Sequence, residues 1–285
     1  TESILMRNLF SIGRHPVWLT VPSLLLLLVA LGYPLAQVVL RSFTDPAIGL
    51  DNYVWFFSRP VNLTVFWRTF EVAGLVTILC LVLGYPYAWM MTAVGPRMRL
   101  LLILCVLVPF WVSGVVRTLA WVILLQDSGV INRGLVALGF EKVRLIRTPL
   151  GVIIGMTQVL LPFMIMPLYA VMRSIDLRLV QAARSLGARP TLAFVQIYLP
   201  LSLPGVFGGA IIVFILGLGF YITPALLGGP RATMLSTLAQ QQVLQQLNWG
   251  RGGAMGVILL VSTLVLLAVA ARFTRRRYQI TGGSK

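Results

Sequence analysis

Long apolar runs alternate with short polar segments along the whole chain. A bilayer core about 30 Å thick is crossed by about 20 helical residues at 1.5 Å each. About six runs reach that length, near residues 17–40, 70–94, 100–125, 150–172, 203–227 and 252–271. Several contain proline, which membrane helices tolerate because neighbouring groups satisfy the freed carbonyls. The pattern predicts an all-α integral membrane protein with about six transmembrane helices.

Composition supports this class. Hydrophobic residues make up 58% of the 285 residues and charged residues only 11%. A soluble chain of this size needs more charge to cover its surface. The segments between the runs are too short to bury a core of their own. We therefore expect a single transmembrane domain over residues 1–285.

The net charge of +16 lies mostly between the apolar runs. Lys and Arg in this arrangement fix the orientation of a membrane protein, so we expect no nucleic-acid partner. A cytoplasmic N-terminus places 13 Lys and Arg residues inside and nine outside. Because cytoplasmic loops are enriched in these residues, both termini are predicted to be cytoplasmic.

The segment 173–200, between the fourth and fifth runs, has a helical pattern of its own. Its apolar positions recur at helical spacing, whereas its polar positions fall on another face. The apolar set is Leu179, Val180, Ala183 and Leu186, and the polar set is Arg178, Gln181 and Ser185. Gly187 is suited to end a helix and to start a sharp turn. The pattern predicts a short amphipathic helix within 177–190 that lies on lipid or docks into a partner's groove.

The same segment resembles the EAA signature of ABC importer permeases. Gln181-Ala182-Ala183 is followed by three residues, then Gly187, nine residues, Ile197, one residue and Leu199-Pro200. The chain departs from the signature at Gln181, where the family usually has Glu, so an ion pair to the ATPase is in doubt at this position. The resemblance assigns ATPase coupling to Asp176, Gln181, Ala182, Ala183, Gly187, Ala188, Ile197, Leu199 and Pro200.

Further segments are similar to the spermidine/putrescine-type branch of these permeases, within a family core of about 68–272. They lie at 83–88, 109–113, 116–121, 129–132, 223–229 and 248–250. The resemblance implies a bacterial inner-membrane permease, embedded in lipid, that moves a polyamine into the cytoplasm. It also implies a periplasmic solute-binding protein, a second permease subunit of homologous sequence, and an ATPase dimer that binds ATP and Mg²⁺. Because acidic residues are nearly absent from the spans, γ-aminobutyrate, other amino-acid-like solutes and a chelated metal stay open as substrates.

The chain lacks the residues that would make it an enzyme. A phosphate-binding P-loop ends in Gly-Lys-Ser/Thr, but Lys142 precedes Val143 and Lys285 is the last residue. His15, the sole histidine, precedes the first span, and no cluster suggests a metal site. We therefore expect no cofactor in this chain. A secondary transporter or a channel stays open as an alternative, although the sequence shows no convincing inverted repeat, no Asp, Glu or His at mid-span, and no recognisable selectivity filter.

Arg117 is the one charged residue well inside an apolar run. Such a charge is expensive in a membrane, so it marks either a pathway or a buried ion pair, with Glu71 or Asp127 as candidate partners. Four further residues, Trp121, Gln158, Tyr221 and Thr223, are candidates to line a substrate pathway. For Gln158 and Thr223, a hydrogen-bonded contact between helices is equally open.

Overall fold

The computed structural model describes residues 17–281, with side chains from Val21 to Val269 and at Arg272. Every regular element in this range is helical, and six stretches are long and apolar enough to cross a membrane. The longer helices are α2 (Val17–Thr44), α4 (Pro60–Ala93), α5 (Pro96–Leu107), α6 (Gly114–Leu125), α8 (Pro149–Ser174), α11 (Leu199–Gly219) and α14 (Trp249–Thr281). The shorter helices are α3 (Asp51–Ser58), α7 (Val130–Ala137), α9 (Leu177–Ser185), α10 (Pro190–Ala193), α12 (Ile222–Leu227) and α13 (Leu235–Leu244). The all-α membrane fold predicted from the apolar runs is confirmed.

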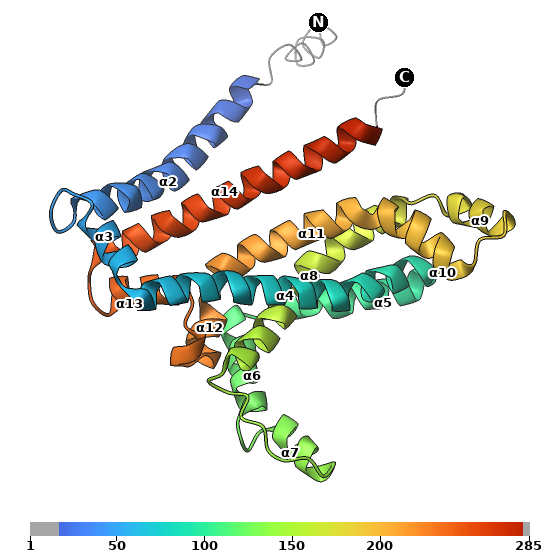
Figure 1. Ribbon diagram of the computed structural model, residues 1–285, viewed down its shortest axis with the longest axis horizontal. Helices are drawn as coiled ribbons and strands as arrows, with labels where there is room; N and C mark the ends of the chain where they lie inside the picture. Colours follow the sequence, from blue (N-terminus) through green and yellow to red (C-terminus); the bar gives the residue numbers. More distant parts are fainter. Residues whose placement is uncertain (1–16, 282–285) are drawn as a thin grey trace, which may run out of the picture.

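Three helices, α4, α8 and α11, pack together as the core of the bundle (Figure 1). Met164 of α8 is fully buried among them. A Cβ added at Gly84 of α4 would lie 3.1 Å from Met164 Cγ, and one added at Gly209 of α11 would lie 2.8 Å from Met164 Sδ. Glycine at these two positions therefore lets α4 and α11 approach α8 closely. Helices α2 and α14 form a second pair, which is joined to the core near α3 and α13.

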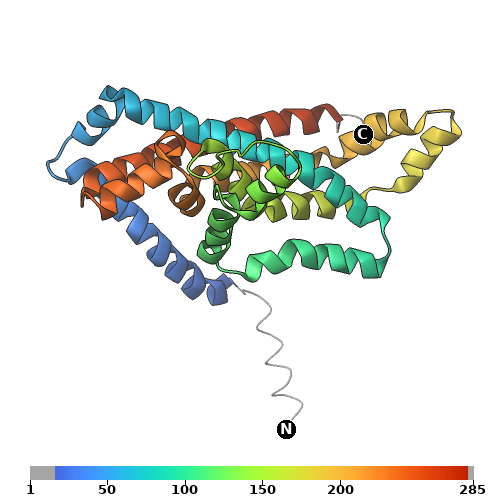
Figure 2. The ribbon, with the colours of Figure 1, turned by 90° about the horizontal axis from the view of Figure 1, so that it is seen from below.

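The third predicted span is broken rather than continuous. Helices α5 and α6 have 12 residues each, about 18 Å of helix at 1.5 Å per residue, so neither crosses a bilayer alone. They are joined by the 3₁₀ turn η2 (Val108–Trp111) and meet at a sharp bend (Figure 2). Pro109 has no N–H to continue α5, and in a helix its ring would clash with the carbonyl of Cys105. One continuous helix over 100–125 was therefore a wrong prediction, and the third candidate span is Gly114–Ala137.

The fifth span also differs from its prediction over 203–227. Helix α11 ends at Gly219, and Phe220 has an extended backbone with ψ 126°. The following residues form the separate helix α12. Since hydropathy averages over this break, the apolar pattern could not reveal it.

The two ends of the bundle are different in structure. Helices α3 and α13 lie at the left-hand end of Figure 1, and α9 and α10 lie at the right-hand end. Six crossings would place both ends of the described chain on the same side of the membrane. The segment that follows the fourth span would lie on that side too. Of the residues used to predict orientation, Arg7, Arg14 and Lys285 lie outside the described residues, as does His15.

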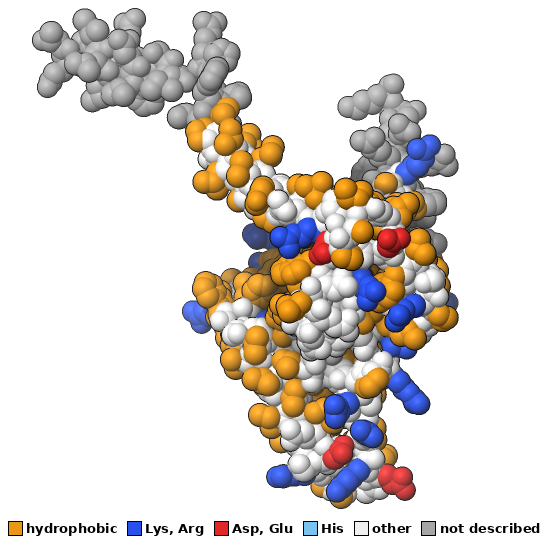
Figure 3. All heavy atoms as spheres, turned by 90° about the vertical axis from the view of Figure 1, so that its left-hand side faces the viewer, with side chains coloured by type: hydrophobic (Ala, Val, Ile, Leu, Met, Phe, Trp, Pro, Cys, Tyr) orange, Lys and Arg blue, Asp and Glu red, His pale blue; other side chains and the backbone are white. Residues whose placement is uncertain are grey.

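Cation–aromatic contacts are concentrated at the end that carries α3 and α13. The Arg251 guanidinium lies 4.4 Å from the ring centroid of Trp55, and that of Arg41 lies 5.2 Å from Trp249. Figure 3 shows this end, where Lys and Arg side chains are scattered among apolar ones. Trp and Arg are typical of the membrane–water interface, so this end is suited to that position.

Candidate functional site

Helix α9 carries the first part of the predicted coupling segment, and Asp176 caps its N-terminus. The Asp176 Oδ1 atom accepts a hydrogen bond of 2.9 Å from the backbone N–H of Arg178. This bond satisfies one of the free N–H groups at the start of the helix. Asp176 therefore has a defined structural part in the segment.

The C-terminus of α9 is closed by a Schellman motif around Gly187. The Gly187 N–H donates to the Arg184 carbonyl, and the Ala188 N–H donates to the Ala183 carbonyl, each at 3.0 Å. Gly187 has φ +91°, in the left-handed region that favours glycine. The prediction that Gly187 ends the helix is confirmed. The helix itself ends at Ser185, before the expected limit of 190, because this motif stops it.

The amphipathic face of α9 is largely uncovered by the described chain. Val180 and Ala183 are half-buried against their own chain, but Leu179 is exposed and Leu186 is 89% exposed. Gln181 and Ala182 are also exposed. An amphipathic helix that is capped at both ends and leaves Leu179 and Leu186 uncovered is suited to dock into a groove of another protein.

The rest of the coupling segment leads into the fifth span through an unusual turn. After α10 comes the π-helix η3 (Phe194–Tyr198), in which the Leu199 N–H donates to the Phe194 carbonyl five residues earlier. Pro200 has no N–H, and in a regular α-helix its ring would clash with the carbonyl of Gln196. The wider π turn relieves this conflict. Ile197, Leu199 and Pro200 therefore lie at the junction between a π turn and α11.

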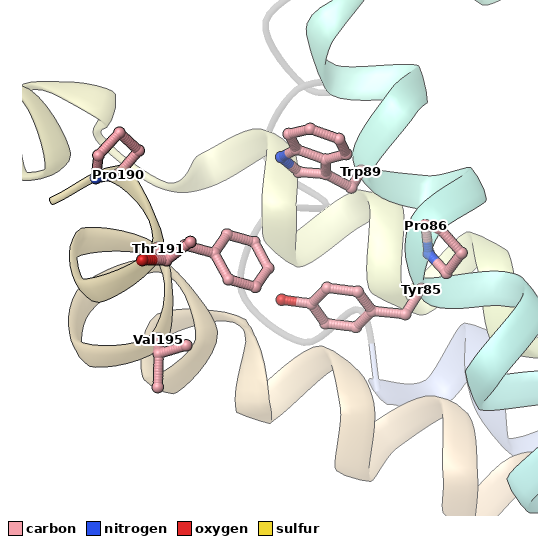
Figure 4. A pocket seen from close by; sticks show the side chains of 7 residues that line it. Tyr85, Pro86, Trp89, Pro190, Thr191 and Val195 are labelled. Carbon is pink, nitrogen blue, oxygen red and sulfur yellow. The ribbon is translucent and has the colours of Figure 1, made fainter.

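A groove of about 470 Å³ lies between this turn and α4 (Figure 4). It is lined by Tyr85, Pro86 and Trp89 of α4 and by Pro190, Thr191, Phe194 and Val195 of the coupling segment.

Phe194 forms the aromatic link across this groove. Its ring lies edge-on to Tyr85 at 6.2 Å and to Trp89 at 6.4 Å, and it stacks on Tyr198 at 5.5 Å. Beside them, the Tyr85 hydroxyl and Ser202 Oγ share a hydrogen bond of 2.9 Å. The sequence analysis missed Phe194, and its nearest signal was the family-like segment 83–88, which contains Tyr85.

The candidate pathway residues fall into separate contacts. Trp121 Nε1 donates a 3.2 Å hydrogen bond to Gln158 Oε1, which brings these two residues together between α6 and α8. Thr223 is fully buried, and its hydroxyl lies 3.3 Å from that of Thr118, so it forms a contact between helices. Tyr221 is exposed just before α12, and its carbonyl accepts a 2.9 Å hydrogen bond from the Ala225 N–H, but no side-chain hydrogen bond of the described residues includes its hydroxyl.

Arg117 of α6 lies beside Phe110, with its guanidinium carbon 5.9 Å from the ring centroid. In the described chain, its Nε and Nη1 atoms are enclosed without a hydrogen-bond partner. Glu71 and Asp127 are both exposed. Neither carboxylate pairs with Arg117 in the described chain, so the ion pair with Glu71 or Asp127 was a wrong prediction.

Comparison with known families identifies the fold. Residues 17–278 match the family described as "Binding-protein-dependent transport system inner membrane component". The chain belongs to this permease family. The permease is thus a multi-pass inner-membrane component of a transport system, as the six apolar helices indicate.

Relatives place it more closely within the family. The permease is 35% identical to spermidine/putrescine transport system permease protein PotB of Haemophilus influenzae over 227 residues, 79% of each chain. It is 34% identical to PotB of Escherichia coli over 236 residues, 82% of this chain and 86% of PotB.

Among solved structures, a bacterial ABC transporter that imports alginate matches with TM-score 0.72 and 23% identity, covering 94% of this chain and 99% of that one. The MetNI methionine ABC transporter matches with TM-score 0.59 and 19% identity, covering 79% of this chain and 97% of that one. These two likenesses show the fold that the permease shares with ABC importers.

Proposed function

We propose that this permease moves polyamines such as putrescine or spermidine into the cytoplasm, driven by ATP that separate subunits hydrolyse. The observation that carries the coupling part is α9, a short helix capped by Asp176 at one end and closed by Gly187 at the other. Its uncovered apolar face supports docking of an ATPase subunit there. The polyamine substrate is supported by the 34–35% identity to the two PotB permeases.

ATP and Mg²⁺ would be bound by a pair of ATPase subunits, since this chain has no P-loop. Closure of the ATPase pair would move α9 as a nearly rigid body, because the caps at both of its ends keep the helix folded. Phe194 would pass the movement to α4 through its contacts with Tyr85 and Trp89. This coupling role includes Ile197, Leu199 and Pro200, which join the segment to α11.

The opposite end, with α3 and α13, would receive a periplasmic binding protein that delivers the solute. This orientation places both termini in the cytoplasm and agrees with the distribution of Lys and Arg. The solute path would run between this chain, as one transmembrane domain, and a second permease subunit. Trp121 and Tyr221 offer aromatic faces that attract ammonium groups. Gln158 bonds to Trp121, and Thr223 lies in α12, which begins directly after Tyr221.

The test is ATP-driven uptake into liposomes that contain this permease, the second permease subunit and the ATPase pair, with loaded binding protein on the outer side. Labelled spermidine and putrescine should accumulate, whereas γ-aminobutyrate should not. Accumulation of γ-aminobutyrate in place of polyamines would reject the substrate. The chain alone should show no ATPase activity above background. If it alone accumulated solute on a proton or sodium gradient, it would be a secondary transporter.

A further inference from the structure

Arg117 is half-buried, and the described chain leaves its positive charge without a counter-charge. Its Nε and Nη1 atoms are enclosed and have no hydrogen-bond partner. A guanidinium in a membrane segment is costly, and it is commonly paired with a carboxylate or another acceptor. The contact with the Phe110 ring, 5.9 Å from the guanidinium carbon, does not supply a negative charge.

The neighbouring polar groups do not supply one either. Trp121 lies one turn after Arg117 on the same side of α6, but its indole is itself a donor, to Gln158 Oε1. Thr118, the next residue, bonds to the Gly114 carbonyl and contacts the Thr223 hydroxyl. These groups are neutral, and no side chain of the described chain pairs with the Nε and Nη1 atoms of Arg117, so a counter-charge would have to come from another molecule.

Arg117 lies near the base of an arm that leaves the helical body. Helices α6 and α7 extend downward from the body in Figure 1, away from α4 and α11. Asn132 holds the arm together, because its side chain donates to the Val143 carbonyl and accepts from the Val143 N–H, each at 3.0 Å. The arm is therefore a folded unit rather than a loose loop.

Part of the arm's outer surface is apolar and uncovered, although Asp127 and Arg133 on the arm are also exposed. Exposed side chains on it include Val116, Leu119, Ile123, Val130 and Leu138, of which Ile123 is 62% and Leu138 75% exposed. An apolar surface that projects from a membrane bundle and has an unpaired cation near its base fits another membrane protein with a carboxylate at the matching depth.

We propose that an Asp or Glu of the second permease subunit pairs with Arg117 where that subunit packs against the α6–α7 arm. The proposal rests on the proposed function, which supplies both the second subunit and the solute. A polyamine carries ammonium groups only, so the solute cannot provide the carboxylate. Because Arg117 is only half-buried, a carboxylate of the second subunit would reach its guanidinium from the side that the described chain leaves open.

The experiment measures recovery of the complete complex in mild detergent, with the tag on the second subunit. Arg117→Gln should lower recovery of this chain about tenfold, whereas Arg117→Lys should keep most of it because the charge remains. Arg144→Gln is the matched control, since Arg144 is exposed and close in sequence to the arm. Size-exclusion chromatography of each variant alone excludes those that fail to fold.

Charge reversal identifies the partner residue. Arg117→Glu should prevent assembly, and changing one intramembrane Asp or Glu of the second subunit to Arg should restore it. Normal recovery with Arg117→Gln, or no restoration after all of those acids have been tested singly, would overturn the proposal. If Arg117→Gln assembles normally but raises the KM for a carboxylate-bearing solute, the counter-charge belongs to the solute. Spermidine uptake by the wild-type complex is measured separately, so the proposed function can stand if the proposed ion pair fails.

Discussion

Substitution of Gly187 tests whether the geometry of α9 carries the coupling. Gly187 has φ +91°, and nothing lies within 4 Å of a Cβ added there. The cost of Gly187→Ala is therefore conformational rather than steric, about 1–2 kcal/mol for a non-glycine residue in the left-handed region. Gly187→Pro costs more, because it fixes φ near −65° and removes the N–H that bonds to the Arg184 carbonyl.

These costs fall on a segment that the membrane core does not hold. No residue of α9 is buried, so the two caps largely determine where the helix ends and which way it points. Breaking the Schellman motif should unwind the last turn of α9 while the spans stay folded. We expect Gly187→Pro to abolish uptake and Gly187→Ala to reduce it severalfold, with normal membrane insertion in both.

The assay is spermidine uptake in reconstituted liposomes, together with the ATPase activity that loaded binding protein stimulates. Both activities should fall together, since the ATPase would lose its contact. Gly139→Ala is the matched control, because Gly139 also has a positive φ, +82°, and also has free space around a Cβ. Gly139 closely follows α7, which lies far from α9 in Figure 1. Wild-type uptake by Gly187→Pro, or an equal loss in Gly139→Ala, would refute the coupling role.

Three other predictions follow from the same structure. A cysteine at Ser185 should resist impermeant thiol reagents added outside whole cells and one at Ile48 should react; the reverse labelling would overturn the orientation. Asn132→Ala should lower stability by about 1–3 kcal/mol, measured as thermal unfolding of the purified chain, because the backbone groups of Val143 lose their partner; an unchanged transition would contradict that role. Phe194→Ala should remove three aromatic contacts worth about 0.5–1.5 kcal/mol each and lower uptake while stimulated ATPase activity persists. Phe207→Ala, which changes an exposed aromatic of α11, should leave uptake unchanged, and an equal loss there would argue against a specific link.

The outer limits of most spans were predictable, but the breaks within two of them were not. An apolar run indicates only that its residues avoid water. One long helix and two short helices give the same hydropathy pattern. The breaks at Pro109 and Phe220 depend on backbone geometry, which hydropathy does not include. Pro109 was visible in the sequence, yet proline inside α4 and α8 leaves those helices continuous. Proline alone therefore could not locate the break.

The coupling segment was more predictable than the pathway because its signals are local. Asp176 and Gly187 form helix caps with backbone groups only a few residues away, and such caps can be recognised from the residue types alone. The surroundings of Arg117 depend on how α6 packs against segments far away in the chain. Its unpaired state, like the role of Phe194, could be found only with the fold in hand.

If α9 couples ATPase subunits to the bundle as proposed, the two ends of the coupling segment would contribute different steps. Gly187 fixes the end of α9, the helix that a partner subunit would bind, whereas Phe194 packs the segment against α4. A change at Gly187 should therefore disturb the ATPase subunits themselves, because they would lose the surface that they hold. A change at Phe194 leaves that surface intact and should break only the step from α9 to the membrane helices. If both changes gave the same loss of ATPase stimulation, the segment would move with α4 as one rigid body. Phe194 would then contribute to the surface that the ATPase subunits bind. If only Phe194→Ala hydrolysed ATP without transport, the aromatic contacts with Tyr85 and Trp89 would be the point at which the movement enters the bundle.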